Sequence, residues 1–152
     1  MTIVIQRTPC IESDEWTTLA PMPDARHECQ ACALGDLVYV VGGESAAGVR
    51  LSSVCRFDPA SGSWSTVEPM STARENFGVF VLGGCMYAAG GVETDQSAEK
   101  YDPDTDSWSD VSPMRGNGRR WFCVQSVTTM AEIAEENLFD NLIAKAEAGR
   151  RG

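Results

Sequence analysis

Short apolar runs bounded by glycine, proline or aspartate recur along the first two thirds of this 152-residue chain. Runs of this length between turn-forming residues are typical of strands rather than helices. The run Leu37–Val41 is nearly continuous and ends at Gly42 and Gly43, which predicts a strand buried on both faces before a close backbone approach or a positive φ. The pattern predicts two groups of four strands, at residues 28–34, 37–41, 52–57 and 63–67, and at 77–82, 85–89, 98–101 and 107–111.

The two groups of strands repeat each other in sequence. The double glycine at 42–43 returns at 90–91, and Asp58-Pro59 returns as Asp102-Pro103. A further cue, tryptophan followed by x-x-(Leu/Val)-x-Pro-Met, begins at Trp16, Trp64 and Trp108. Repetition with a period of 44 to 48 residues predicts a stacked or radial array of one structural unit.

The chain changes character near residue 128. Thr129 and Glu132 form a capping box, and apolar residues then recur at helical spacing. We therefore expect a repeat region over 1–127 and a C-terminal amphipathic helix and tail over 128–152. The full repeats are expected at about 26–70 and 74–114, with a half unit before them and one strand after them.

These repeats resemble the kelch motif. The double glycine closing an apolar strand, the aromatic before Asp-Pro and the tryptophan after it, as in Arg56-Phe57-Asp58-Pro59 and Trp64, carry the resemblance. It implies four-stranded blades of a β-propeller, so the expected fold is all-β, an incomplete kelch propeller of about two blades with flanking strands and the C-terminal helix. Among kelch proteins the chain looks most like the kelch-like adaptors, which pair a BTB domain with a kelch propeller.

Two blades are too few for a closed ring, because propellers have roughly four to eight. We favour a fragment or alternative product of a larger propeller protein, because the repeat breaks off abruptly after Met114. Completion of the ring by homo-oligomerisation is the other possibility. No BTB segment is recognised in the sequence, so any contact with cullin is expected to need a BTB domain supplied elsewhere.

Charge and composition narrow the partners. The net charge of −10 disfavours nucleic acid and anionic membrane surfaces. We find no signal peptide and no apolar run of transmembrane length, so a cytoplasmic location is expected. The six cysteines lack framework spacing and are expected to be free thiols.

Candidate catalytic and metal chemistry is sparse. His27, Cys29 and Cys32 form H-x-C-x-x-C, but positions 29 and 32 of a strand point to opposite faces, so we expect no metal site. His27 is the only histidine, which disfavours triad chemistry, and the double glycines lack the Lys-Ser/Thr of a P-loop. We expect no cofactor and no enzymatic activity.

The kelch resemblance places the inter-blade segment and the loop after the double glycine on one face, which family members use to hold peptides. Some members carry a binding arginine where this chain has Glu28 and Asn76, so a neutral or basic ligand fits better than an acidic one. For Arg26 and Arg74, structural hydrogen bonds to blade carbonyls are the alternative to ligand binding. The candidate partner-binding residues are Asp24, Arg26, His27, Glu28, Glu44, Arg50, Ser71, Arg74, Glu75, Asn76 and Glu93.

The function expected from this resemblance is protein recognition, as the substrate-binding module of a cullin-RING ubiquitin ligase adaptor. An actin-associated or scaffolding kelch protein and an inactive truncated product are the alternatives, and a kelch-fold enzyme is the least favoured. The repeated tryptophans are expected to be packing anchors between blades rather than binding residues.

Overall fold

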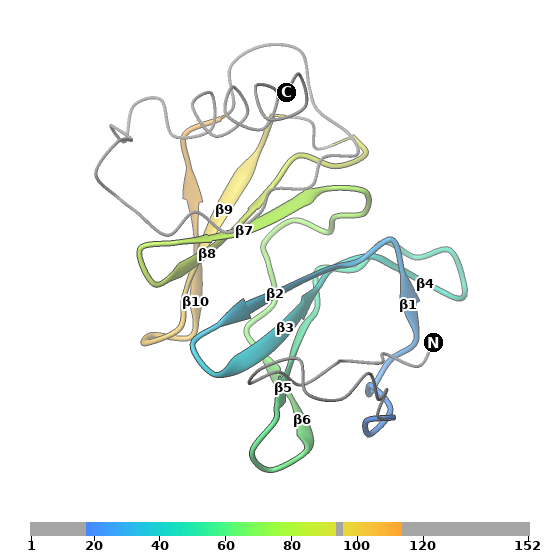
Figure 1. Cartoon of the computed structure of the whole chain (residues 1–152). Helices are drawn as coiled ribbons and strands as arrows, with labels where there is room; N and C mark the ends of the chain where they lie inside the picture. The colour runs from blue at the N-terminus through green and yellow to red at the C-terminus, as the bar shows by residue number, and fades with distance from the viewer. Residues whose placement is uncertain (1–17, 94–95, 114–152) are drawn as a thin grey trace, which may run out of the picture.

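The computed structural model describes residues 18–93 and 96–113, which form two four-stranded antiparallel sheets and one short two-stranded pair (Figure 1). Blade 1, with strand order β2-β3-β5-β6, consists of β2 (Gln30–Leu34), β3 (Leu37–Val41), β5 (Val54–Asp58) and β6 (Ser63–Val67). Blade 2, with strand order β7-β8-β9-β10, consists of β7 (Gly78–Leu82), β8 (Cys85–Ala89), β9 (Ala98–Asp102) and β10 (Ser107–Val111). The pair joins β1 (Arg26–His27) to β4 (Glu44–Ser45).

All eight strands expected from the sequence are confirmed, each within two residues of its expected ends. Each blade is a meander in which consecutive strands pair, as local turns require. The β1–β4 pair was not anticipated, because two-residue strands carry no hydrophobic pattern. The expected C-terminal helix, the last strand and all but residues 18–22 of the half unit before blade 1 lie outside the described residues. Within the described part of the chain, no helix could cross a membrane.

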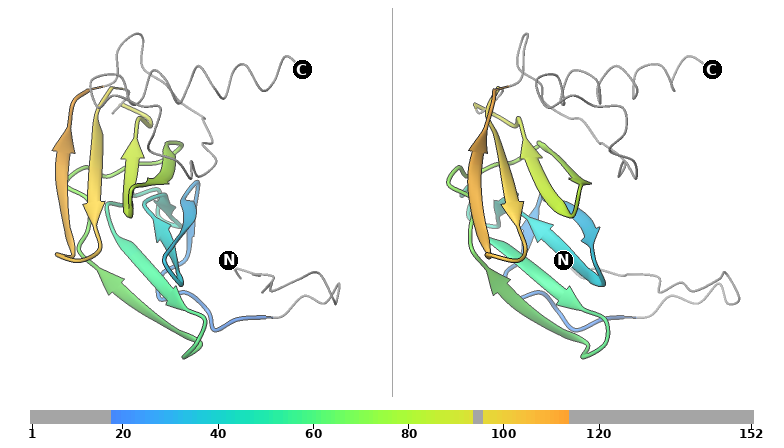
Figure 2. Two further views of the ribbon diagram at one scale, coloured as in Figure 1. Left: turned by 60° about the vertical axis from the view of Figure 1, so that its left-hand side comes forward. Right: turned by 90° about the vertical axis from the view of Figure 1, so that its left-hand side faces the viewer.

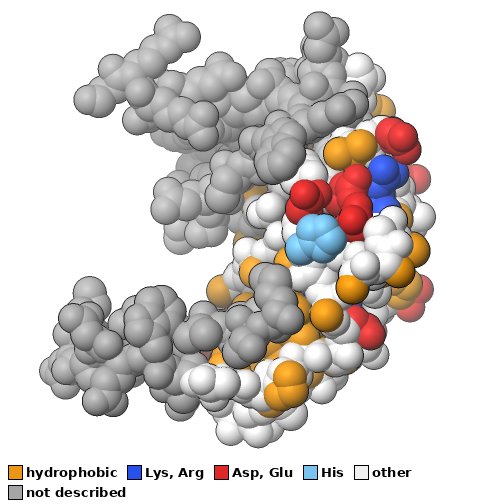
Figure 3. All heavy atoms as spheres, turned by 90° about the vertical axis from the view of Figure 1, so that its right-hand side faces the viewer, with side chains coloured by type: hydrophobic (Ala, Val, Ile, Leu, Met, Phe, Trp, Pro, Cys, Tyr) orange, Lys and Arg blue, Asp and Glu red, His pale blue; other side chains and the backbone are white. Residues whose placement is uncertain are grey.

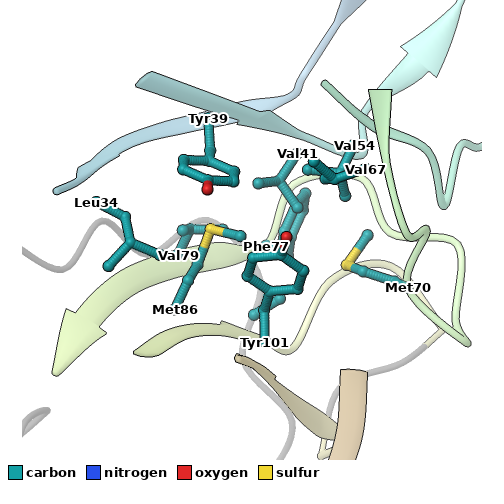
Figure 4. Close-up of a cluster of buried hydrophobic side chains, with 11 residues drawn as sticks. Leu34, Tyr39, Val41, Val54, Val67, Met70, Phe77, Val79, Met86 and Tyr101 are labelled. Atoms are coloured by element: carbon teal, nitrogen blue, oxygen red, sulfur yellow. The ribbon is translucent and has the colours of Figure 1, made fainter. Parts of the chain in front are cut away.

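The two blades lie side by side, with β2 next to β7 (Figure 2). A buried apolar cluster fills the space between them, and Tyr39 of blade 1 meets Tyr101 of blade 2 with ring centroids 5.8 Å apart (Figure 4). On the other face of β3, Val40 packs with Met22 and Cys55. Both faces of β3 are therefore buried, which explains its nearly continuous apolar sequence.

The repeated tryptophans join neighbouring units, as the sequence suggested. The indole N–H of Trp64 donates to the carbonyl oxygen of Ala20, 2.8 Å away, in the segment preceding blade 1. The indole N–H of Trp108 in blade 2 donates to the carbonyl oxygen of Glu68, 2.9 Å away, at the end of blade 1. Each indole also packs at a tilt against an aromatic ring of its own blade, Phe57 for Trp64 and Tyr101 for Trp108, so it links its blade to the previous unit. Trp16 lies outside the described residues.

Candidate protein-binding face

The double glycine after β3 forms a close backbone joint between the blades. Gly42 and Gly43 have φ values of 57° and 94°. A Cβ on Gly42 would lie 2.6 Å from the carbonyl oxygen of Arg74, and one on Gly43 would lie 2.5 Å from that of His27. The Gly43 N–H donates to the Arg74 carbonyl oxygen over 2.7 Å. Positive φ and close backbone approach, the two expected reasons for glycine, therefore both apply here. The joint places the loop after β3 against the segment that enters blade 2.

Arg26 and Arg74 lie beneath this face rather than on it, with only 3% and 0% of their surfaces exposed. The Arg74 guanidinium donates to the carbonyl oxygens of Gly90 and Ser97, at 2.8 and 3.1 Å. Arg26 makes the equivalent bonds inside blade 1, to the carbonyl oxygens at positions 42 and 53, at 3.1 and 2.9 Å. The structural alternative therefore accounts for both guanidinium groups, which hold the blade together and do not point toward a ligand.

Blade 2 adds a buried ion pair that the sequence did not reveal. Arg74 and Glu99 are 2.9 Å apart, and both side chains are almost fully buried. The Glu99 carboxylate also accepts from the N–H and hydroxyl of Ser71 and from the Thr72 N–H, at 2.7, 2.8 and 3.2 Å. Burial alone raises the pKa of Glu99, but the bonds from Ser71 and Arg74 together lower it below its ordinary value. Cys55 takes the place of Glu99 in blade 1.

Above this layer, Arg50 links carboxylates from two loops. Its guanidinium lies 3.3 Å from Glu75, which enters blade 2, and 3.1 Å from Glu93, which follows the second double glycine. The hydrogen bond with Glu93 raises the pKa of Arg50. His27 on β1 lies 3.3 Å from the Glu44 carboxylate on β4. The loop after β3 thus contacts β1 through Glu44 and His27, and it contacts two segments of blade 2 through the ion pairs of Arg50.

Glu28 and Asn76 occupy equivalent positions in the two blades and bond to each other. The Asn76 side-chain amide donates to the Glu28 carboxylate, and the Asn76 N–H donates to the Glu28 carbonyl oxygen over 3.3 Å. Both residues have positive φ, 53° and 52°, which is uncommon for residues other than glycine. The structure holds both side chains in fixed directions on this face, since a strained backbone persists only where its surroundings determine it.

Seven of the sequence-predicted residues therefore come together in one group, which we call the acidic face. In Figure 3, acidic side chains gather beside the histidine and a basic side chain on this side of the molecule. Asp24 stands apart, with its side chain 69% exposed and 3.9 Å from Arg26. The acidic face consists of His27, Glu28, Glu44, Arg50, Glu75, Asn76 and Glu93.

Comparison with known proteins agrees with this architecture. The chain is similar to human Kelch-like protein 23, with 41% identity over 49 residues, which is 32% of this chain and 9% of that protein. It therefore aligns with a small part of that relative's length. Its fold is similar to the solved structure of YjhT, with a TM-score of 0.65 and 18% identity, covering 72% of this chain and 45% of that one. The Kelch motif model matches residues 25–71 and 73–115, more than half of the sequence, so the chain belongs to the kelch repeat family.

Proposed function

We propose that the acidic face is a protein-binding surface and that the chain recognises substrates for a cullin-RING ubiquitin ligase. Kelch repeats are generally protein-binding modules. The observation that carries the choice of face is the convergence of loop side chains from both blades at Arg50, which bonds Glu75 and Glu93. Loop side chains fixed on a rigid β scaffold are the usual way in which a repeat protein presents a binding surface.

The ligase role is supported by the resemblance to kelch-like adaptors and the similarity to Kelch-like protein 23. In such adaptors the propeller selects the substrate and the BTB domain contacts cullin. This chain would therefore supply selectivity, and its link to cullin would pass through a BTB domain.

The test joins the full 152-residue chain to a BTB domain and measures cullin recovery and protein ubiquitination in cells. We expect cullin to be recovered with the fusion and not with the chain alone. At least one protein should gain ubiquitin with the fusion, and Arg50→Glu should abolish this gain because it breaks the ion pairs with Glu75 and Glu93 that hold the loops of the two blades together. Asp36→Asn is the control for a charge change away from the face, because Asp36 is exposed and lies at the opposite end of β3 from Glu44.

Two results would contradict the proposal. One is ubiquitination that is unchanged by Arg50→Glu in every protein recovered. The other is sedimentation of the chain with actin filaments that Arg50→Glu abolishes, which would favour the scaffolding alternative.

A further inference from the structure

Glu75 carries an unpaired carboxylate oxygen beneath the acidic face. Its side chain is only 10% exposed, and Oε1 lies 3.3 Å from the Arg50 guanidinium. Oε2 is shielded from solvent and has no hydrogen-bond partner within the described residues. Leaving a buried carboxylate oxygen without a donor is unfavourable, so this atom is suited to receive a donor from outside the chain.

Glu44 lies beside this carboxylate, because its backbone pairs with that of Arg50, whose guanidinium bonds Glu75. Its pKa is raised, first by a hydrogen bond with Glu75, then by burial and by the negative charge of Glu75, while His27 acts in the opposite sense. Two carboxyl groups in contact share a proton or need a cation between them. The Glu44 side chain is 29% exposed, so an incoming group can reach the pair from solvent by displacing the proton.

The surrounding charges also favour a cation. Glu28, Glu44, Glu75 and Glu93 supply four carboxylates against the single guanidinium of Arg50, which leaves a formal charge of −3 with His27 neutral. The two buried arginines beneath do not cancel this charge, because each has a carboxylate of its own in its blade. The ligand in the proposed function is a protein, and the cationic groups that a protein offers are the side chains of lysine and arginine.

We propose that this face binds a lysine or arginine side chain of a partner protein between the carboxylates of Glu44 and Glu75. This inference rests on the proposed function and names the chemistry of its ligand. The ammonium or guanidinium donates to Glu44, which is partly exposed, and reaches the shielded oxygen of Glu75 when the Glu44 side chain turns outward. The proton that the two carboxyls share leaves to solvent. Glu28 and Glu93 flank the pair and add attraction without direct contact.

Binding should therefore depend on pH. Because the pKa of Glu44 is raised, its proton competes with the ligand more strongly as the pH falls from neutral. The other titratable groups around Glu44 are His27, 3.3 Å away, and Glu28, Glu75, Glu93 and Arg50. Arg50 stays charged throughout this range, because the hydrogen bond with Glu93 raises its pKa further.

The experiment measures fluorescence anisotropy of a labelled peptide of alternating arginine and glycine with the full chain. A peptide of alternating glutamate and glycine is the negative probe. Glu75→Gln and Glu44→Gln should each weaken binding of the arginine peptide by about tenfold, the order expected for one close charge contact. Asp36→Asn removes the same charge from the far end of β3 and should weaken binding by less than about twofold.

Equal weakening by Asp36→Asn, or no weakening by Glu75→Gln and Glu44→Gln, would overturn the inference and leave only general attraction to an acidic protein. If Glu75→Gln does not fold by circular dichroism, Glu44→Gln decides, because its side chain is partly exposed. Acidification should weaken the wild-type complex more than the Glu44→Gln complex. If the arginine peptide does not bind as expected but ubiquitination by the BTB fusion still depends on Arg50, the basic ligand is rejected and the proposed function stands.

Discussion

The buried pair Arg74–Glu99 offers the sharpest test of how blade 2 is held together, because blade 1 lacks it. The perturbation is Glu99→Cys, which gives blade 2 the residue that blade 1 has at Cys55. The change leaves the buried Arg74 guanidinium with only the carbonyl oxygens of Gly90 and Ser97 as acceptors. It also removes the carboxylate that accepts from the Ser71 N–H.

The magnitude follows from burial. Both side chains of the pair are at most 1% exposed, so solvent screening is slight. Removing one partner of such a pair lowers the free energy of unfolding by about 3–5 kcal/mol. Since small domains are stable by roughly 5–15 kcal/mol, this loss should be plain in any equilibrium measurement.

Blade 1 also indicates a rescue. There the buried Arg26 has the carboxylate of Asp24 3.9 Å away, and Thr72 is the equivalent of Asp24 in blade 2. Thr72→Asp should therefore stabilise the Glu99→Cys variant, by about 1 kcal/mol for a partly exposed ion pair. In the wild-type protein the same substitution should be destabilising. The Thr72 N–H donates to Glu99, so the new carboxylate at position 72 would be close to the negative charge of Glu99.

Urea unfolding followed by tryptophan fluorescence measures all four proteins as a double-mutant cycle. We expect Thr72→Asp to raise the free energy of unfolding of the Glu99→Cys variant and to lower that of the wild-type protein. The reasoning is refuted if Thr72→Asp shifts the stability of both proteins in the same direction. It is also refuted if Glu99→Cys lowers the free energy of unfolding by less than about 1 kcal/mol.

The pair also predicts a response to acid. Because bonds from Ser71 and Arg74 outweigh burial and lower the folded-state pKa of Glu99, its stabilisation is complete above the unfolded-state pKa of about 4.3. It is lost as the pH falls through the lower folded-state pKa. Glu99→Gln should therefore reduce the fall in the free energy of unfolding at acid pH, as measured by urea unfolding across pH. An unchanged fall would mean that other carboxylates cause it.

Three further predictions concern single sites. Gly43→Ala should destabilise by at least about 2 kcal/mol more than Gly62→Ala in thermal unfolding, because both have positive φ but only Gly43 meets backbone, and equal costs would contradict the proposed joint. Trp108→Phe should lower the free energy of unfolding by about 1 kcal/mol, since it removes the bond to the Glu68 carbonyl and keeps the ring, and no loss in urea unfolding would deny that link. Burial raises the pKa of Cys32 to about 12, so this thiol should resist iodoacetamide at neutral pH in the native chain and react after denaturation, as followed by peptide mass spectrometry; rapid native labelling would contradict its burial.

The strands could be predicted because their signals are local. Apolar runs and the turn residues that end them lie within a few positions of each other, and Asp58 shows the same locality by accepting from the Ala60 N–H and the Ser61 hydroxyl at 2.8 Å. The members of the acidic face could be predicted because the kelch resemblance implies that the inter-blade segment and the loop after the double glycine share one face, and the repeat then gives equivalent positions. Asn76 and Glu28, which share both slot and backbone conformation, illustrate this most directly.

The directions and partners of the charged side chains could not be predicted in the same way. Whether Arg74 faces a ligand or its own blade depends on carbonyl oxygens 16 and 23 positions away. Glu99 lies in a mixed strand beside Lys100, so the sequence around it gave no signal of burial, and only the fold brings it to Arg74. The burial of Glu75 and its unpaired oxygen likewise result from packing between loops of two blades.

The double glycine and the buried arginine act together rather than separately. Arg74 ties its side chain to the carbonyls of blade 2 while its own carbonyl accepts from Gly43 of blade 1. One residue thus fixes the position of the loop that carries Glu44 and Arg50 relative to the next residue along the chain, Glu75. Arg26 occupies the same slot before blade 1, where its side chain bonds the carbonyl oxygens at positions 42 and 53. An arginine that never touches the ligand is therefore the residue that sets the spacing of the carboxylates that would bind it.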